Sequence, residues 1–86
     1  MTTAVYVANA DSHDIAVLAL DARTGALAEV QRVAAGGVVM PLAVSPDRRV
    51  LHASIRSEPY TVLSLAIDAA SGRLAEIGRA PLPASM

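Results

Sequence analysis

The sequence predicts an all-β fold, because seven apolar runs of strand length alternate with short stretches rich in Gly, Pro, Asp and Ser. The clearest separator is Ser45-Pro46-Asp47, in which Pro46 presets the φ angle of a tight turn and its two neighbours can hydrogen-bond to nearby backbone. The runs on its two sides should therefore pair as antiparallel strands. The expected strands are residues 3–8, 15–20, 26–33, 40–44, 50–55, 61–67 and 73–79.

Composition limits both the size of the core and the kinds of partner. The chain has 86 residues, enough for one small domain, and although 53% of them are hydrophobic there are two Tyr and no Phe or Trp. Such a core buries little area per residue, which argues against a stable isolated monomer. The net charge of −1, with both signs interspersed, argues against nucleic acid, and no apolar run is long enough to span a membrane. There is no Cys and the N-terminus lacks the features of a signal peptide, so we expect a cytoplasmic protein without disulfides.

An internal repeat identifies the kind of β structure. Residues 21–30 match residues 68–77 at a constant offset of 47, and residues 5–8 align with residues 50–53. A repeat of this period, built from strands and turns, is the signature of a β-propeller blade. The repeat also bears on residues 26–33, whose Ala, Leu, Glu and Gln would otherwise favour a short helix. A blade would place this segment in its outermost strand.

The phase of the repeat predicts how the chain divides. The first unit lacks the innermost strand that residues 40–44 supply to the second unit. We expect residues 1–37 to form three strands of a closing blade. In a full ring, the C-terminal end of the propeller would supply the missing innermost strand of this blade. Residues 38–86 should form one complete four-stranded blade and a tail, so the chain would hold about one and three-quarter blades of a β-propeller. Two prolines argue against regular structure in residues 80–86.

Three segments carry a resemblance to a known family: Val5-Tyr6-Val7-Ala8-Asn9, residues 40–51 with their Ser-Pro-Asp-Arg turn, and residues 68–74. In this order they resemble the seven-bladed lactonase family, and within it the N-terminal portion of the bacterial propeller-type 6-phosphogluconolactonases. The resemblance implies a seven-bladed ring with a site in its central channel. It also implies hydrolysis of 6-phosphoglucono-1,5-lactone to 6-phosphogluconate in the pentose phosphate pathway, without a metal or other cofactor.

The resemblance points to one substrate-binding residue, Arg56, which ends a strand where the family has an Arg. Its planar guanidinium suits the anionic group of a sugar-lactone substrate. The alternative is a solvated loop residue that pairs with Glu58. The chain departs from the family pattern at Met40, where a polar residue is expected before Pro41, and at His52, where a strand aromatic is usual.

The two histidines have structural interpretations. His13 lies in a loop beside Asp11 and Asp14, and this trio favours a solvated turn over a metal site because a metal loop needs more ligands at defined spacing. His52 alternates with apolar neighbours in a strand, which favours packing in the core or between blades.

No catalytic residue can be assigned from the sequence. Glu29 and Glu76 are equivalent in the repeat, which suggests a structural role on the outermost strands, and the family's other acid–base candidates have no counterpart here. The chain is therefore either an incomplete, inactive part of a lactonase or a non-enzymatic repeat module. The module would associate with copies of itself or with a partner chain, since a lone blade leaves apolar faces and strand edges uncovered.

Overall fold

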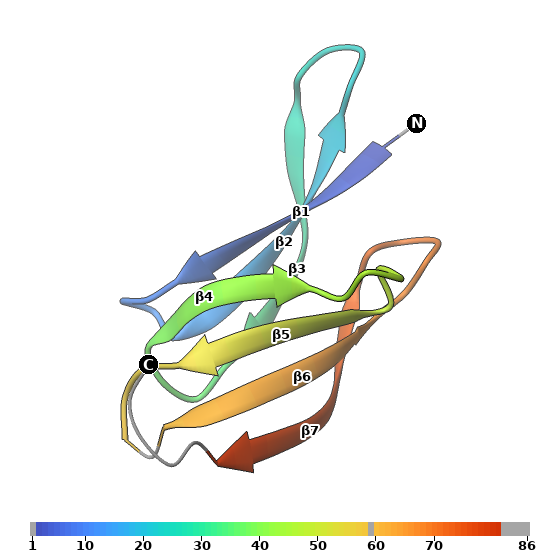
Figure 1. Cartoon of the computed structure of the whole chain (residues 1–86). Helices are drawn as coiled ribbons and strands as arrows, with labels where there is room; N and C mark the ends of the chain where they lie inside the picture. The colour runs from blue at the N-terminus through green and yellow to red at the C-terminus, as the bar shows by residue number, and fades with distance from the viewer. Residues whose placement is uncertain (1, 59, 82–86) are drawn as a thin grey trace.

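The computed structural model describes residues 2–58 and 60–81, which form seven strands and no helix (Figure 1). The all-β prediction is confirmed, and each strand lies within one or two residues of its expected bounds. The last strand runs through Pro81, so the irregular structure predicted for residues 80–86 is wrong at its first two positions; the others lie outside the described residues. An edge strand tolerates proline because its outer N–H needs no partner. The strands are β1 (Thr2–Asn9), β2 (Asp14–Asp21), β3 (Leu27–Ala34), β4 (Val39–Val44), β5 (Val50–Ile55), β6 (Thr61–Ile67) and β7 (Leu74–Pro81).

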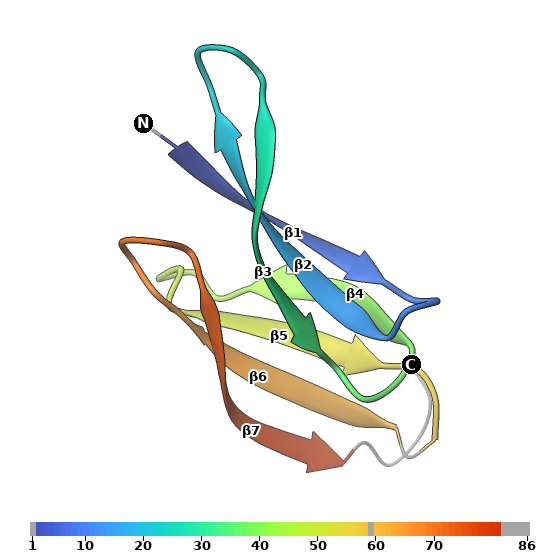
Figure 2. The ribbon, with the colours of Figure 1, turned by 180° about the vertical axis from the view of Figure 1, so that it is seen from behind.

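The strands form two antiparallel sheets that face each other (Figures 1 and 2). The first sheet has the order β1-β2-β3 and the second the order β4-β5-β6-β7. Within each sheet, consecutive strands pair with each other, as short connecting turns allow, and the chain passes from one sheet to the other between β3 and β4. The segment that could have been a helix is the edge strand β3. The assignment of the first sheet to a closing blade remains a prediction.

The core lies between the two sheets and is almost entirely aliphatic. The first sheet contributes Ile15 and Val17 from β2, and both are fully buried. The second sheet contributes Leu51 from β5 together with Leu63 and Leu65 from β6, which are also fully buried. Each such side chain contributes about 1.5–3 kcal/mol by leaving water, so this contact is the main force that joins the sheets.

Side chains of the first sheet also hydrogen-bond to the backbone of the second. The amide of Gln31 pairs with both backbone groups of Leu74, with 2.9 Å from Nε2 to the carbonyl oxygen and 2.7 Å from the Leu74 nitrogen to Oε1. The Tyr6 hydroxyl donates to the carbonyl of Gly72 at 2.7 Å. These bonds set the position of β7, the outer edge of the second sheet, relative to β1 and β3.

The structure reproduces the sequence repeat down to its irregularities. The pairing of β2 with β3 shifts register between Val17 and Leu18, and the pairing of β6 with β7 shifts between Ser64 and Leu65. The two shifts lie 47 residues apart, the same offset as the sequence repeat. The turns also match, because Gly25 and Gly72 both have a φ of 77° and both donate to an Asp carbonyl four residues earlier at 2.7 Å.

The register corrects the sequence alignment of β1 with β5. Tyr6 pairs with Val17 in the first sheet, and His52 pairs with Ser64 in the second. Since Val17 and Ser64 are equivalent, Tyr6 corresponds to His52, an offset of 46. The alignment of residues 5–8 with residues 50–53 is therefore wrong by one residue. The error matters because a shift of one residue moves every side chain to the opposite face of its strand.

Candidate functional site

Arg56, the residue expected to bind substrate, directly follows β5 and has an exposed side chain. Its backbone N–H donates to the carbonyl oxygen of Val38 at 2.6 Å. This bond continues the β4–β5 ladder by one residue beyond Ile55, which pairs with Val39. A backbone hydrogen bond therefore holds Arg56 in place where β4 begins and β5 ends. Its role in binding remains a prediction.

A second polar residue, Ser54, lies two positions before Arg56. Side chains at this spacing along an extended segment point to the same face. Ser54 is only 7% exposed, and its Oγ is a buried oxygen without a hydrogen-bond partner among the described residues. A buried hydroxyl without a partner costs about 1–3 kcal/mol, so it is a candidate to bind an incoming ligand atom.

The backbone opposite Ser54 is irregular. Ile55 pairs with Val39 and Ala53 pairs with Leu42, so two residues of β4 oppose the single residue between them on β5. One of the two is Pro41, which has no N–H to donate. Irregular pairing of this kind is common beside functional sites, where it redirects side chains. The sequence analysis did not single out Ser54; the one signal that could have found it is a weak one, a serine between apolar strand residues.

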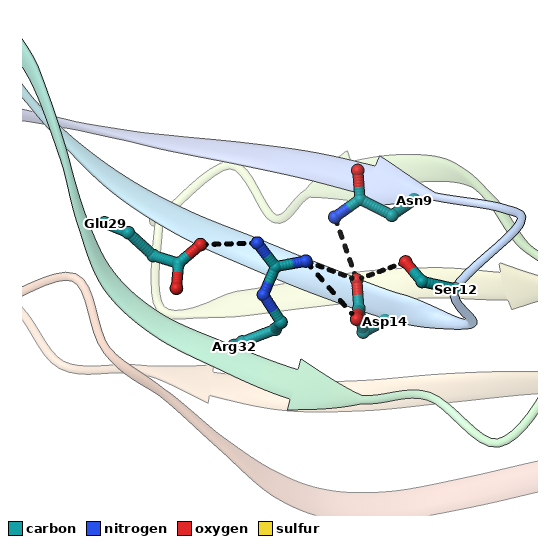
Figure 3. A network of polar contacts seen from close by, with 5 residues as sticks. All are labelled: Asn9, Ser12, Asp14, Glu29 and Arg32. Carbon is teal, nitrogen blue, oxygen red and sulfur yellow. Dashed lines mark hydrogen bonds and ion pairs between the residues drawn. The ribbon is translucent and has the colours of Figure 1, made fainter.

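A network of polar contacts lies on the outer face of the first sheet, at the start of β2 (Figure 3). Its centre is Asp14, which accepts hydrogen bonds from Asn9 Nδ2 at 2.8 Å and from Ser12 Oγ at 3.1 Å. Arg32 Nη1 lies 3.4 Å from both Asp14 oxygens, while its Nη2 contacts Glu29 Oε1 at 2.5 Å. Donation from Asn9 and Ser12, together with the charge of Arg32, lowers the pKa of Asp14, and Glu29 raises the pKa of Arg32.

This network does not include a metal site. His13 is exposed and has a φ of 59°, as a turn residue can, and Asp14 is committed to its amide, hydroxyl and guanidinium donors. Within residues 2–58 and 60–81, no three His, Cys, Asp or Glu side chains gather where they could hold a metal ion. Glu29 and Glu76 lie on the edge strands β3 and β7, and each pairs with the Arg three residues later.

His52 is not in the core, and that part of its predicted role is wrong. The alternation of β5 turns its neighbours Leu51 and Ala53 into the core, so His52 points to the opposite, exposed face. There its Nδ1 lies 3.0 Å from Ser64 Oγ on the neighbouring strand. Packing of His52 between blades remains a prediction.

A groove of about 790 Å³ opens between the sheets at the other end of the molecule. Its walls include the start of β1 and the Ser45–Val50 turn, which precedes β5, whereas Arg56 follows that strand. The polar side chains in the walls carry both signs, with Asp47 and Asp68 beside Arg48 and Arg49. This balance favours no particular charged ligand. The residues that the structure describes include no helix long and apolar enough to cross a membrane.

Comparisons with known proteins agree with the fold. The chain is 41% identical over 85 residues to the 6-phosphogluconolactonase of Cronobacter sakazakii and 42% identical over 85 residues to that of Yersinia pestis. Each match covers 99% of this chain and 25% of the relative, so the chain spans about a quarter of the length of these curated relatives. A crystal structure from Bacteroides uniformis, of a protein provisionally assigned as 6-phosphogluconolactonase, superposes with a TM-score of 0.81 at 26% identity over 90% of this chain and 23% of that one.

A family model matches nearly the same extent of the chain as these relatives do. The family described as a lactonase with a seven-bladed β-propeller matches residues 2–86, which is nearly the entire chain. The matched region includes both sheets and every turn described above. This chain belongs to the seven-bladed β-propeller lactonase family.

Proposed function

We propose that this chain forms part of a lactonase ring that hydrolyses 6-phosphoglucono-1,5-lactone to 6-phosphogluconate, with Arg56 binding the anionic end of the substrate. The names of its relatives support the choice of substrate. The observation that carries the role of Arg56 is its neighbour Ser54, a buried hydroxyl without a partner on the same face of the same segment. We also propose that the protein acts in the cytoplasm, where a phosphorylated sugar lactone of central metabolism is formed.

In this proposal, the segment that holds Ser54 and Arg56 binds the substrate, and residues of other blades transfer the protons. The guanidinium of Arg56 can hold two phosphate oxygens at once through parallel N–H bonds, and the Ser54 hydroxyl can donate to a further substrate oxygen. Hydrolysis adds water to the lactone carbonyl carbon, breaks the ring C–O bond and returns a proton to the ring oxygen. These steps need a general base and donors for the oxyanion. We expect both from the remainder of the ring.

A chimera tests the proposal without requiring the chain to act alone. This chain replaces the matching quarter of the Cronobacter relative, and turnover of 6-phosphoglucono-1,5-lactone is measured beside that of glucono-1,5-lactone, which has no phosphate. Hydrogen bonds to charged groups contribute about 1.5–3 kcal/mol, so Arg56→Ala should lower kcat/KM for the phosphorylated lactone by about 10- to 100-fold and change the other substrate little. Arg49→Ala, at the opposite end of β5, is the matched control and should retain activity.

Two results would count against this assignment. An Arg56→Ala chimera with unchanged kcat/KM for the phosphorylated lactone would remove Arg56 from the site. A folded chimera that turns over neither lactone would favour the second candidate, a non-enzymatic blade module. That candidate is supported by the large apolar side chains that the outer faces of the two sheets leave exposed, Leu27 and Ile77 among them.

A further inference from the structure

The connection between the two sheets ends beside Arg56, the residue assigned above to substrate binding. It comprises residues 35–38 and links β3 to β4 (Figure 1). Both backbone groups of its last residue, Val38, bond to the segment that follows β5. The Val38 carbonyl accepts from the Arg56 N–H at 2.6 Å, and the Val38 N–H donates to Ser57 Oγ at 3.0 Å. Arg56 is thus held by its own N–H and by the side chain of the next residue.

The hydroxyl of Ser57 takes the place of a backbone acceptor. Because Val39 pairs with Ile55, the register places Val38 opposite Arg56. Two residues of a hydrogen-bonded antiparallel pair exchange both N–H···O bonds, so a continued ladder would direct the Val38 N–H to the Arg56 carbonyl. Here that N–H donates to Ser57 Oγ. The chain can therefore leave the sheet at Arg56 while its backbone stays fixed against Val38.

Gly37 makes room for this contact. The residue is buried, and a Cβ at its position would lie 2.5 Å from Ser57 Oγ and 2.7 Å from Ile55 Cγ2, closer than real Cβ atoms approach their neighbours. A larger residue here would push Ser57 away from Val38. The sequence therefore supplies both the hydroxyl and the space that lets it reach the Val38 N–H.

The connection is a firm support for this contact, because it is also held at its start. Ala35 is fully buried, and its N–H donates to the carbonyl oxygen of His13 in the first sheet's β1–β2 turn at 2.8 Å. The Ala35 carbonyl accepts from Arg79 Nη1 of β7 at 3.0 Å. Bonds from both sheets thus fix the connection before it reaches Val38, and Val38 in turn fixes Arg56.

We propose that Ser57 is a positioning residue for Arg56: through Val38, its hydroxyl fixes the direction from which the guanidinium meets the phosphate of the substrate. This inference rests on the proposed role of Arg56. An exposed arginine gives up rotamer freedom when it binds, and a fixed backbone reduces the freedom that remains to be lost. Removal of the hydroxyl should therefore weaken binding of the phosphorylated end and leave the chemistry at the lactone carbonyl unchanged.

The chimera described above tests this role by separating KM from kcat. Ser57→Ala should raise KM for 6-phosphoglucono-1,5-lactone by about 2- to 10-fold, the range that one neutral hydrogen bond contributes. The value of kcat and the KM for glucono-1,5-lactone should not change. Ser57→Thr keeps the hydroxyl and should restore KM. Ser45→Ala is the matched control, because Ser45 Oγ also accepts from a backbone N–H, that of Val50 at 3.1 Å, at the opposite end of β5.

Combining Ser57→Ala with Arg56→Ala gives the decisive test. If Ser57 acts through Arg56, the double variant should match Arg56→Ala alone, because the hydroxyl then has no guanidinium to position. A further rise of KM in the double variant would overturn the inference, and so would equal rises for both lactones in Ser57→Ala. Circular dichroism checks that each chimera keeps its strands.

The same measurements separate this inference from the proposed function. If Arg56→Ala weakens turnover of the phosphorylated lactone but Ser57→Ala leaves its KM unchanged, the inference is wrong and the proposed function stands. If Arg56→Ala itself has no effect, the proposed role of Arg56 is refuted, and the inference about Ser57 with it.

Discussion

Gln31 offers the sharpest test of how the two sheets are joined. The side chain is half-buried, comes from β3, and binds both backbone groups of Leu74, 43 residues later. Gln31→Met keeps the length and volume of the side chain but removes both hydrogen bonds. Two backbone groups of a residue that is 5% exposed then lose their partners. At about 1–3 kcal/mol for each buried group, and with some recovery by water at this half-buried position, we expect a loss of about 2–4 kcal/mol.

Such a loss is large for a domain of this size, whose total stability is of order 5–15 kcal/mol. One kcal/mol shifts the Tm of a domain of 60–100 residues by about 4–8 °C, so the Tm should fall by at least about 8 °C. Urea unfolding at a fixed protein concentration measures the change. The stability of Gln31→Glu should lie between that of the unmodified chain and that of Gln31→Met, because Glu keeps an acceptor for the Leu74 N–H but loses the donor to the Leu74 carbonyl. Arg23→Met, in the exposed β2–β3 turn, is the control, and a Gln31→Met chain within about 0.5 kcal/mol of it would refute the reasoning.

Two further predictions concern a turn and a carboxylate. Gly72→Ala should destabilise the chain by about 1–3 kcal/mol more than Gly25→Ala in urea unfolding, because both have a φ of 77° but only at Gly72 would a new Cβ approach the Cβ of Ala4, at 2.7 Å. Equal losses would show that the clash is relieved at no cost. Because its pKa is lowered in the folded state, Asp14 stabilises the fold at pH values above the ordinary carboxyl pKa of 3.8. This stabilisation is lost as the pH falls through the folded-state pKa of Asp14. Asp14→Asn should therefore flatten the decline of the urea midpoint between about pH 5 and pH 2, and an unchanged slope would contradict this role.

The sequence was sufficient for the fold because its signals are local and occur twice. The Asp-to-Gly turns at Asp21 and Asp68 mark the ends of β2 and β6, and the glycine of each turn has the positive φ that its position requires. The repeat also correctly favoured a strand for β3 despite its helix-forming composition. Arg56 could be singled out only through the family resemblance, since nothing local distinguishes it from the other exposed arginines.

The features that the sequence did not predict depend on register and on distant contacts. The correspondence of Tyr6 with His52 required the strand pairing, because the loop after β1 differs in length from the loop after β5. The partner of Gln31 lies 43 residues away, and no pattern near either residue connects them. Ser54 became a candidate once its Oγ was seen to be buried without a partner. Each of these facts belongs to the packing of two sheets and has no local signature.

The repeat is imperfect at the residue that joins the two sheets. Gln31 forms the clamp on Leu74, but the residue at its offset of 47 is Gly78, which has no side chain. The second sheet therefore has no counterpart of the two hydrogen bonds that Gln31 makes to Leu74. Because the clamp is absent from one of the two repeat units, neither the repeat nor any local pattern could predict it, although it joins the two sheets.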